Sequence, residues 1–166
     1  MDISKILKEV ILLERGVKKT YENIARDKEK ENKEIGRVLR VLARESEAHA
    51  KKLESRYGIF VKAETVSEGV NGLLSVLSES MAKLKMNTKP VEVLHEGIKI
   101  EGYLEQLYKG LADNYETEEN LEGFLLEMEE RGLKPSELFR EIATDERKHQ
   151  QMLQRLTPQI IKGHSK

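Results

Sequence analysis

The feature of the sequence that most restricts its fold is an internal repeat. Residues 11–27, ILLERGVKKTYENIARD, align with residues 98–114, IKIEGYLEQLYKGLADN, and residues 42–53, LARESEAHAKKL, align with residues 142–153, IATDERKHQQML. The aligned segments carry apolar residues at spacings of three and four, which is typical of amphipathic helices with one buried face. Two similar helix hairpins joined by a long connection predict an all-α four-helix bundle with one long crossover.

The ends of these helices can be placed from turn and capping residues. We predict four long helices, from about Ser4 to Asp27, from about Asn32 to Tyr57, from Pro90 to about Asn114, and from Pro135 to just before Pro158. Gly58 is expected to stop the second helix, and Pro90 to start the third, because glycine and proline favour these positions.

The remaining segments complete the expected organisation. The crossover contains SEGVNGLLSVLSESMAKLKM, which we predict to be helical because structureless loops of that length are unusual in compact domains. Residues 117–132 predict one further short helix. We therefore expect a single helical domain over residues 1–157, and a loosely held C-terminal tail over residues 158–166.

Composition narrows the possible functions. The chain has no cysteine, which excludes disulfides, thiolate metal sites and iron–sulfur ligation by this chain. Its formal net charge is −1, so bulk charge indicates neither a nucleic-acid partner nor a membrane surface. No apolar run is long enough for a membrane span or resembles a signal peptide. We expect a cytoplasmic protein.

Polar residues interrupt the apolar face of each predicted long helix near its middle: Glu14, His49, Glu101, Glu146 and His149. Buried, unpaired carboxylates are strongly unfavourable and would also repel one another. A divalent cation would neutralise them and accepts both carboxylate and imidazole ligands. The spacing of three between Glu146 and His149 places both side chains on one helix face, where they can bind one metal.

These residues resemble the diiron domain of the rubrerythrin family, within the ferritin-like superfamily. That family places one glutamate on each of two helices and a Glu-x-x-His motif on each of the other two. Glu14 and Glu101 match the single glutamates, and Glu146 with His149 matches one motif. The resemblance also implies inward tyrosines near the metal, and Tyr21 and Tyr108 each follow a matching glutamate by seven residues.

One position departs from the family pattern. The resemblance implies a metal-bridging glutamate three residues before His49, where this chain has Ser46. The first half-site would then consist of Glu14 and His49 alone, unless Glu45 replaces the missing ligand from four residues before the histidine. Glu47 is expected to point away. The second half-site, with Glu101 and the Glu-x-x-His motif, is complete.

The resemblance implies a metal-dependent oxidoreductase that uses iron to reduce peroxide or dioxygen. Electrons would come from an external donor, since no cysteine-containing rubredoxin-like segment is present. Zinc and manganese share these ligand types and are alternative metals. A non-catalytic iron-binding protein, or a structural bundle with a degenerate metal site, are the alternative functions. We expect a homodimer or higher homo-oligomer, in which the long crossover would allow helix exchange.

Overall fold

A computed structural model describes residues 3–59, 68–86, 89–115 and 134–163. Within them the chain forms five helices and no strand: α1 (Ile3–Lys28), α2 (Lys33–Tyr57), α3 (Glu68–Met86), α4 (Pro90–Asn114) and α6 (Pro135–Gly163). The predicted all-α bundle and its crossover helix are confirmed, and the four long helices begin within one residue of the expected positions. The short helix predicted at 117–132 lies outside the described residues.

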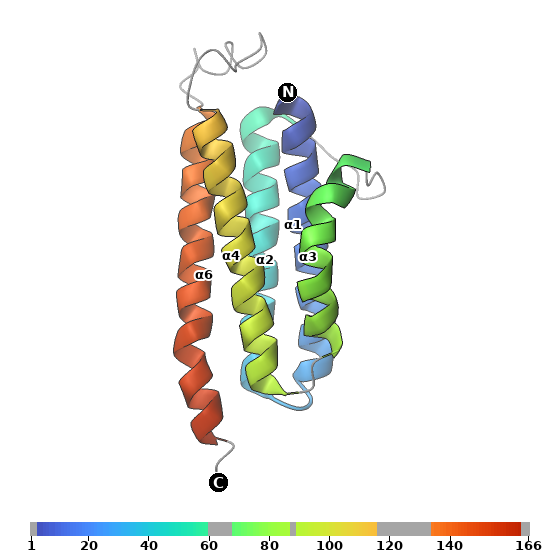
Figure 1. Cartoon of the computed structure of the whole chain (residues 1–166), viewed down its shortest axis with the longest axis vertical. Helices are drawn as coiled ribbons and strands as arrows, with labels where there is room; N and C mark the ends of the chain where they lie inside the picture. Colours follow the sequence, from blue (N-terminus) through green and yellow to red (C-terminus); the bar gives the residue numbers. More distant parts are fainter. Residues whose placement is uncertain (1–2, 60–67, 87–88, 116–133, 164–166) are drawn as a thin grey trace.

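The four long helices form a bundle of two antiparallel hairpins (Figure 1). Helix α1 packs along α2, and α4 packs along α6. The crossover helix α3 contacts both α1 and α4 and lies on the outside of the bundle, beside α1. Because it carries the chain back to the opposite end, α4 starts beside the end of α1 and runs antiparallel to it.

The turn between α1 and α2 shows why the first hairpin closes tightly. The side chain of Asn32 caps α2 by accepting hydrogen bonds from the backbone N–H groups of Glu34 (3.0 Å) and Ile35 (3.2 Å). A Cβ at Gly36 would lie 2.7 Å from the Cβ of Glu29, so only glycine lets the two helix ends approach this closely. At the other end, Gly58 stops α2 with a left-handed φ of 64°, as predicted.

The predicted end of the last helix was wrong. Helix α6 continues through Pro158 to Gly163, although an interior proline removes one backbone hydrogen bond. Ile160 lies beyond the proline and is only 5% exposed within the hydrophobic core cluster. Burial of this side chain favours continuation of the helix to Gly163. In the turn before the proline, the hydroxyl of Thr157 donates to the carbonyl of Leu153 (3.1 Å).

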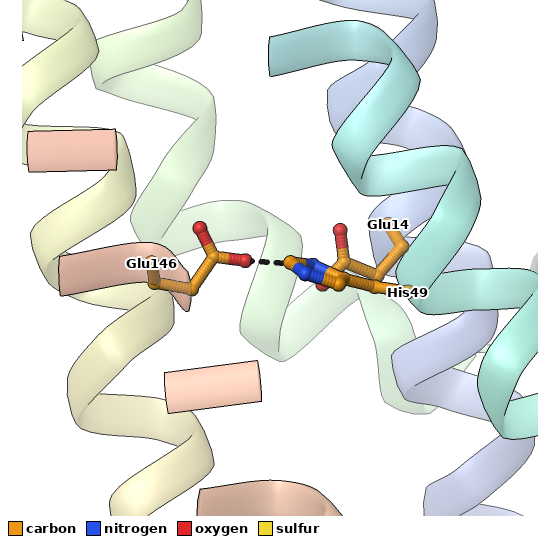
Figure 2. A group of neighbouring side chains, drawn as sticks. All are labelled: Glu14, His49 and Glu146. Atoms are coloured by element: carbon orange, nitrogen blue, oxygen red, sulfur yellow. Dashed lines mark ion pairs between the residues drawn. The ribbon is translucent and has the colours of Figure 1, made fainter. Parts of the chain in front are cut away.

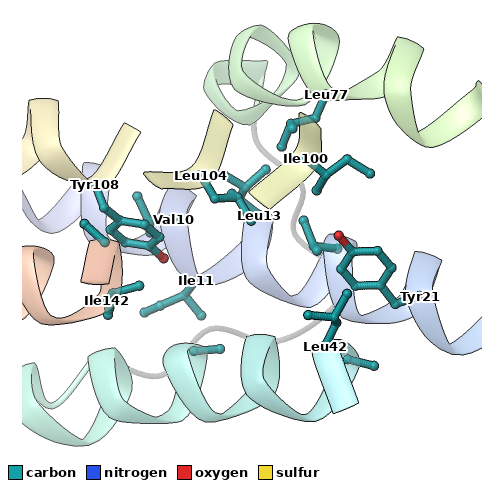
Figure 3. Packing of buried hydrophobic residues seen from close by; sticks show 14 of the residues in the cluster. Val10, Ile11, Leu13, Tyr21, Leu42, Leu77, Ile100, Leu104, Tyr108 and Ile142 are labelled. Carbon is teal, nitrogen blue, oxygen red and sulfur yellow. The ribbon is translucent and has the colours of Figure 1, made fainter. Parts of the chain in front are cut away.

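The core is continuous from the bundle into the crossover helix (Figure 3). Leu13 and Leu104 are fully buried, and Leu77 of α3 is 2% exposed in the same cluster. The crossover helix therefore covers one side of the bundle and keeps water away from its centre. None of the helices among the described residues has a stretch long and apolar enough to cross a membrane.

Candidate metal centre

The five predicted ligands meet in the centre of the bundle. Glu14, Glu101 and Glu146 are at most 2% exposed, and His49 is 3% exposed. The side chain of His149 is slightly more open, at 12%. The five residues come from all four long helices. They meet because each lies on the inward face of its helix, as the apolar spacing predicted.

The five side chains form two groups of possible metal ligands that share one residue. Glu14, His49 and Glu146 form the first group, and Glu101, Glu146 and His149 form the second, with ligand atoms in each group within 4.8 Å of one another. Glu146 Oε1 lies 3.0 Å from Nδ1 of His49, and its Oε2 lies 3.1 Å from Nδ1 of His149. The carboxylate of Glu146 therefore lies between the two imidazoles, and Figure 2 shows it reaching across to His49.

The structure brings one more residue to the first group than the sequence had assigned to it. The sequence indicated Glu14 and His49 alone, with Glu45 as the possible third ligand. Instead, Glu146 reaches the first group from α6, and Glu45 belongs to neither group. Glu45 is half-buried, while Glu47 pairs with Lys18 (3.0 Å), which agrees with its predicted outward direction.

The two predicted tyrosines bind the two single glutamates crosswise. Tyr21 of α1 donates to Oε1 of Glu101 on α4, and Tyr108 of α4 donates to Oε1 of Glu14 on α1. Because α1 and α4 run antiparallel, seven residues along each helix lead in opposite directions, and each tyrosine comes level with the glutamate of the other helix. Both phenols are fully buried, so these bonds fix one oxygen of each carboxylate.

Burial and mutual charge change the protonation of the metal-free site. Burial raises the pKa of the Glu101 carboxyl to about 8, and the nearby Glu146 carboxylate adds to the shift. For His49, burial acts to lower the pKa, but the close carboxylates of Glu14 and Glu146 outweigh it and raise the pKa to about 10. His149 behaves in the same way, with Glu101 and Glu146 raising its pKa to about 10 against burial. In the metal-free site, the protons bound by Glu101, His49 and His149 thus offset the negative charge that a metal ion would otherwise neutralise.

Unsatisfied polar atoms at the first group indicate that a metal fits there. Glu14 Oε2, Glu146 Oε1 and both ring nitrogens of His49 are buried without a hydrogen-bond partner among the described residues. Nδ1 of His49 lies 3.0 Å from Glu146 Oε1 and 3.5 Å from Glu14 Oε1, yet forms a hydrogen bond to neither. Donor atoms that converge without bonding to one another are suited to a shared cation, and three carboxylates with two imidazoles are ligands for first-row divalent metals.

Two features near the site were missed from the sequence. Asp145 Oδ2 lies 3.9 Å from Nε2 of His49, on the side of the ring that faces away from the glutamates. A carboxylate that accepts a hydrogen bond from the far ring nitrogen orients a metal-binding histidine, but at 3.9 Å Asp145 forms no such bond and contributes only its charge. The residue could have been found because it directly precedes Glu146.

The second missed feature consists of two ion pairs at equivalent positions of the two repeats, in which the acidic and basic residues have exchanged places. Lys18 of α1 binds Glu47 of α2 (3.0 Å), whereas Glu105 of α4 binds Arg147 of α6 (2.8 Å). Each pair lies one turn from a ligand and joins the two helices of one hairpin. The sequence alignment of the two repeats could have revealed these ion pairs, because Lys18 aligns with Glu105 and Glu47 aligns with Arg147.

The fold and the buried carboxylate–histidine cluster are those of the ferritin-like class of helical bundles. The family model described as Rubrerythrin matches residues 5–157, and the chain belongs to the rubrerythrin family. Comparison with curated proteins gave no significant match, and neither did comparison with solved structures.

Proposed function

We propose that this protein is a metal-dependent oxidoreductase of rubrerythrin type that binds two iron ions and reduces peroxide or dioxygen. The observation that carries the proposal is the sharing of Glu146 between two three-residue groups, because a carboxylate between two imidazoles is placed to join two metals. The match to the Rubrerythrin family over residues 5–157 supports the same function.

The proposed division of roles follows from the contacts. Glu14 and His49 would hold one ion, Glu101 and His149 the other, and Glu146 both. Two ferrous ions bound there would supply two electrons to peroxide, whose O–O bond breaks with uptake of two protons to give two waters, and an external donor would restore the electrons.

The surrounding residues would keep the ligands in place during turnover. Tyr108 holds Oε1 of Glu14 and leaves its Oε2 available, and Tyr21 holds Oε1 of Glu101. The buried core around these groups excludes water, which strengthens every electrostatic interaction within the site.

A second candidate is a metal-binding protein without turnover. The observation that favours it is Ser46, which is buried at the position where the repeat has Glu146, so the site has three carboxylates rather than four. Fewer anionic ligands stabilise ferric iron less, which would weaken two-electron chemistry. Zinc or manganese would suit such a site as well as iron.

The first experiment is metal analysis of the purified chain, followed by anaerobic loading with ferrous iron. Two ions per chain and rapid oxidation on stopped-flow mixing with peroxide are expected for the oxidoreductase. Tight binding without rapid oxidation would select the second candidate. A chain that binds no divalent metal would refute both candidates and leave a structural bundle.

A further inference from the structure

Position 46 is a buried site in the core that lacks the side chain expected from the repeat. Ser46 lies three residues before His49 on α2, as Glu146 lies three residues before His149 on α6. Ser46 is only 5% exposed, so it occupies the inward face at the level of the ligands. A glutamate side chain differs from a serine side chain by a CH2–COO− group in place of the hydroxyl. The group that position 46 lacks is therefore close in size and charge to a small carboxylate anion.

The geometry of Glu146 indicates what such a carboxylate would do. Its two oxygens lie 3.0 Å and 3.1 Å from Nδ1 of His49 and His149. The repeat relates α2 to α6, so a carboxylate extending from position 46 would approach the same two imidazoles from the α2 side. The serine hydroxyl is too short to reach both.

The net charge of the metal-loaded site also indicates a missing anion. Two divalent ions held by the three carboxylates of Glu14, Glu101 and Glu146 would leave one positive charge uncompensated in a buried site, which is unfavourable. Asp145 already pairs with Lys148 (2.8 Å) and lies beyond the far nitrogen of His49. A single monoanion would restore neutrality.

The site is more open on one side than on the other. The side chain of His149 is 12% exposed, against 4% for His49. The side of His149 is therefore the one nearer to solvent, and its slight exposure favours a small anion over a bulky one.

We propose that the metal-loaded protein binds a small exogenous carboxylate, of the class of formate, acetate or bicarbonate, beside Ser46, in the place that a glutamate side chain would fill. This inference rests on the proposed two-metal site. The Ser46 hydroxyl is available to donate a hydrogen bond to the bound anion.

The test measures thermal unfolding of the full chain loaded anaerobically with two equivalents of ferrous iron or cobalt(II), in a buffer free of carboxylates and phosphate. Sodium formate, acetate, bicarbonate and benzoate are compared with sodium chloride at equal ionic strength. A saturable rise of about 5–10 °C is expected for the small carboxylates at a hundredfold excess over Kd, together with a change in the cobalt absorption spectrum. Benzoate and chloride should give neither.

Two variants provide matched controls. Ser46→Glu fills the position with a covalent carboxylate and should abolish the response to added formate. Ser46→Ala preserves the space and should retain the response with weaker affinity. The relative responses to formate, acetate and bicarbonate identify which source fits best.

The outcomes separate this inference from the proposed function. A chain that binds fewer than two metals in all three proteins would overturn the two-metal site itself. Two bound metals without any carboxylate response would overturn only the anion site and indicate water or hydroxide above Ser46. An equal response in Ser46→Glu, or in the metal-free protein, would show that the anion binds elsewhere and would also overturn the inference.

Discussion

Metal binding by this protein should release protons in unequal numbers from the two halves of the site. In the metal-free protein, the raised pKa values of His49 and His149, about 10 each, keep both imidazoles protonated at pH 7. Glu101, with a pKa of about 8, is also mainly protonated. Ligands must lose these protons before they coordinate a metal.

The size of the effect follows from the ligands of each group. The group of Glu14, His49 and Glu146 loses one proton, so its apparent affinity should rise about tenfold per pH unit below pH 10. The group with Glu101 and His149 loses two protons, so its affinity should rise up to about a hundredfold per unit below pH 8. Two bound ions should together release about three protons at pH 7.

Isothermal titration calorimetry with anaerobic ferrous iron measures this release, when the titration is repeated at pH 6 and 7 in buffers of different ionisation enthalpy. Glu101→Gln should lower the release from about three protons to about two. Glu14→Gln is the comparison variant: it removes a ligand of the other group and one of the two carboxylates that raise the pKa of His49, so its proton release should fall less than that of Glu101→Gln. Affinities that are independent of pH between 6 and 7, or equal proton release for both ions, would refute the reasoning.

The other predictions concern stability and ligand roles. Glu101 and both histidines bind protons more tightly in the folded than in the unfolded chain, since their pKa values rise from 4.5 to about 8 and from 6.5 to about 10. The metal-free protein should therefore lose stability as pH rises, from about pH 4.5 to 8 through Glu101 and from about pH 6.5 to 10 through the histidines, and urea titrations showing the opposite trend would contradict this. Glu146→Gln should weaken the binding of both metals, whereas Glu14→Gln should mainly weaken the binding of one. The number of metals retained per chain after dialysis distinguishes the two variants, and equal losses would argue against a shared ligand. Ser46→Glu should make the second metal bind more tightly while destabilising the metal-free fold. Tight binding of two metals by the unmodified chain would show that Ser46 does not weaken the second site. Tyr108→Phe should destabilise the fold by about 1.5–3 kcal/mol through loss of a buried hydrogen bond to a carboxylate. Tyr57→Phe is the control, because the Tyr57 hydroxyl has no hydrogen-bond partner among the described residues. Equal losses of stability for the two variants in urea denaturation would contradict the role of the Tyr108 hydrogen bond.

The sequence was sufficient to predict which residues enter the core. Helical periodicity places residues on one face with little ambiguity, so the apolar spacing alone identifies Glu14, Glu101 and the Glu-x-x-His motif of α6 as inward-facing. The repeat added His49, which alone would have been an ordinary core histidine. Lengths and termini of α1, α2 and α4 followed from apolar spacing together with Asn32, Gly58 and Pro90 as local signals.

Local signals failed where a distant contact opposed them. Pro158 is a correct indication of a helix end in an isolated segment, because it lacks the N–H that continues the helix. Burial of Ile160 against the core favours continuation, and the sequence of α6 alone does not contain the surface that buries it.

Only the tertiary structure decided how the inward residues divide into groups. The phase of a helix determines the direction of a side chain, but the distance between helices and the side-chain rotamer determine which atoms meet. The sharing of Glu146 between His49 and His149, the exclusion of Glu45 and the crosswise tyrosine bonds all depend on the packing of α1 and α2 against α4 and α6. Periodicity carries no information on these distances, because each helix reports only its own face, and a shared ligand is a property of four helices together.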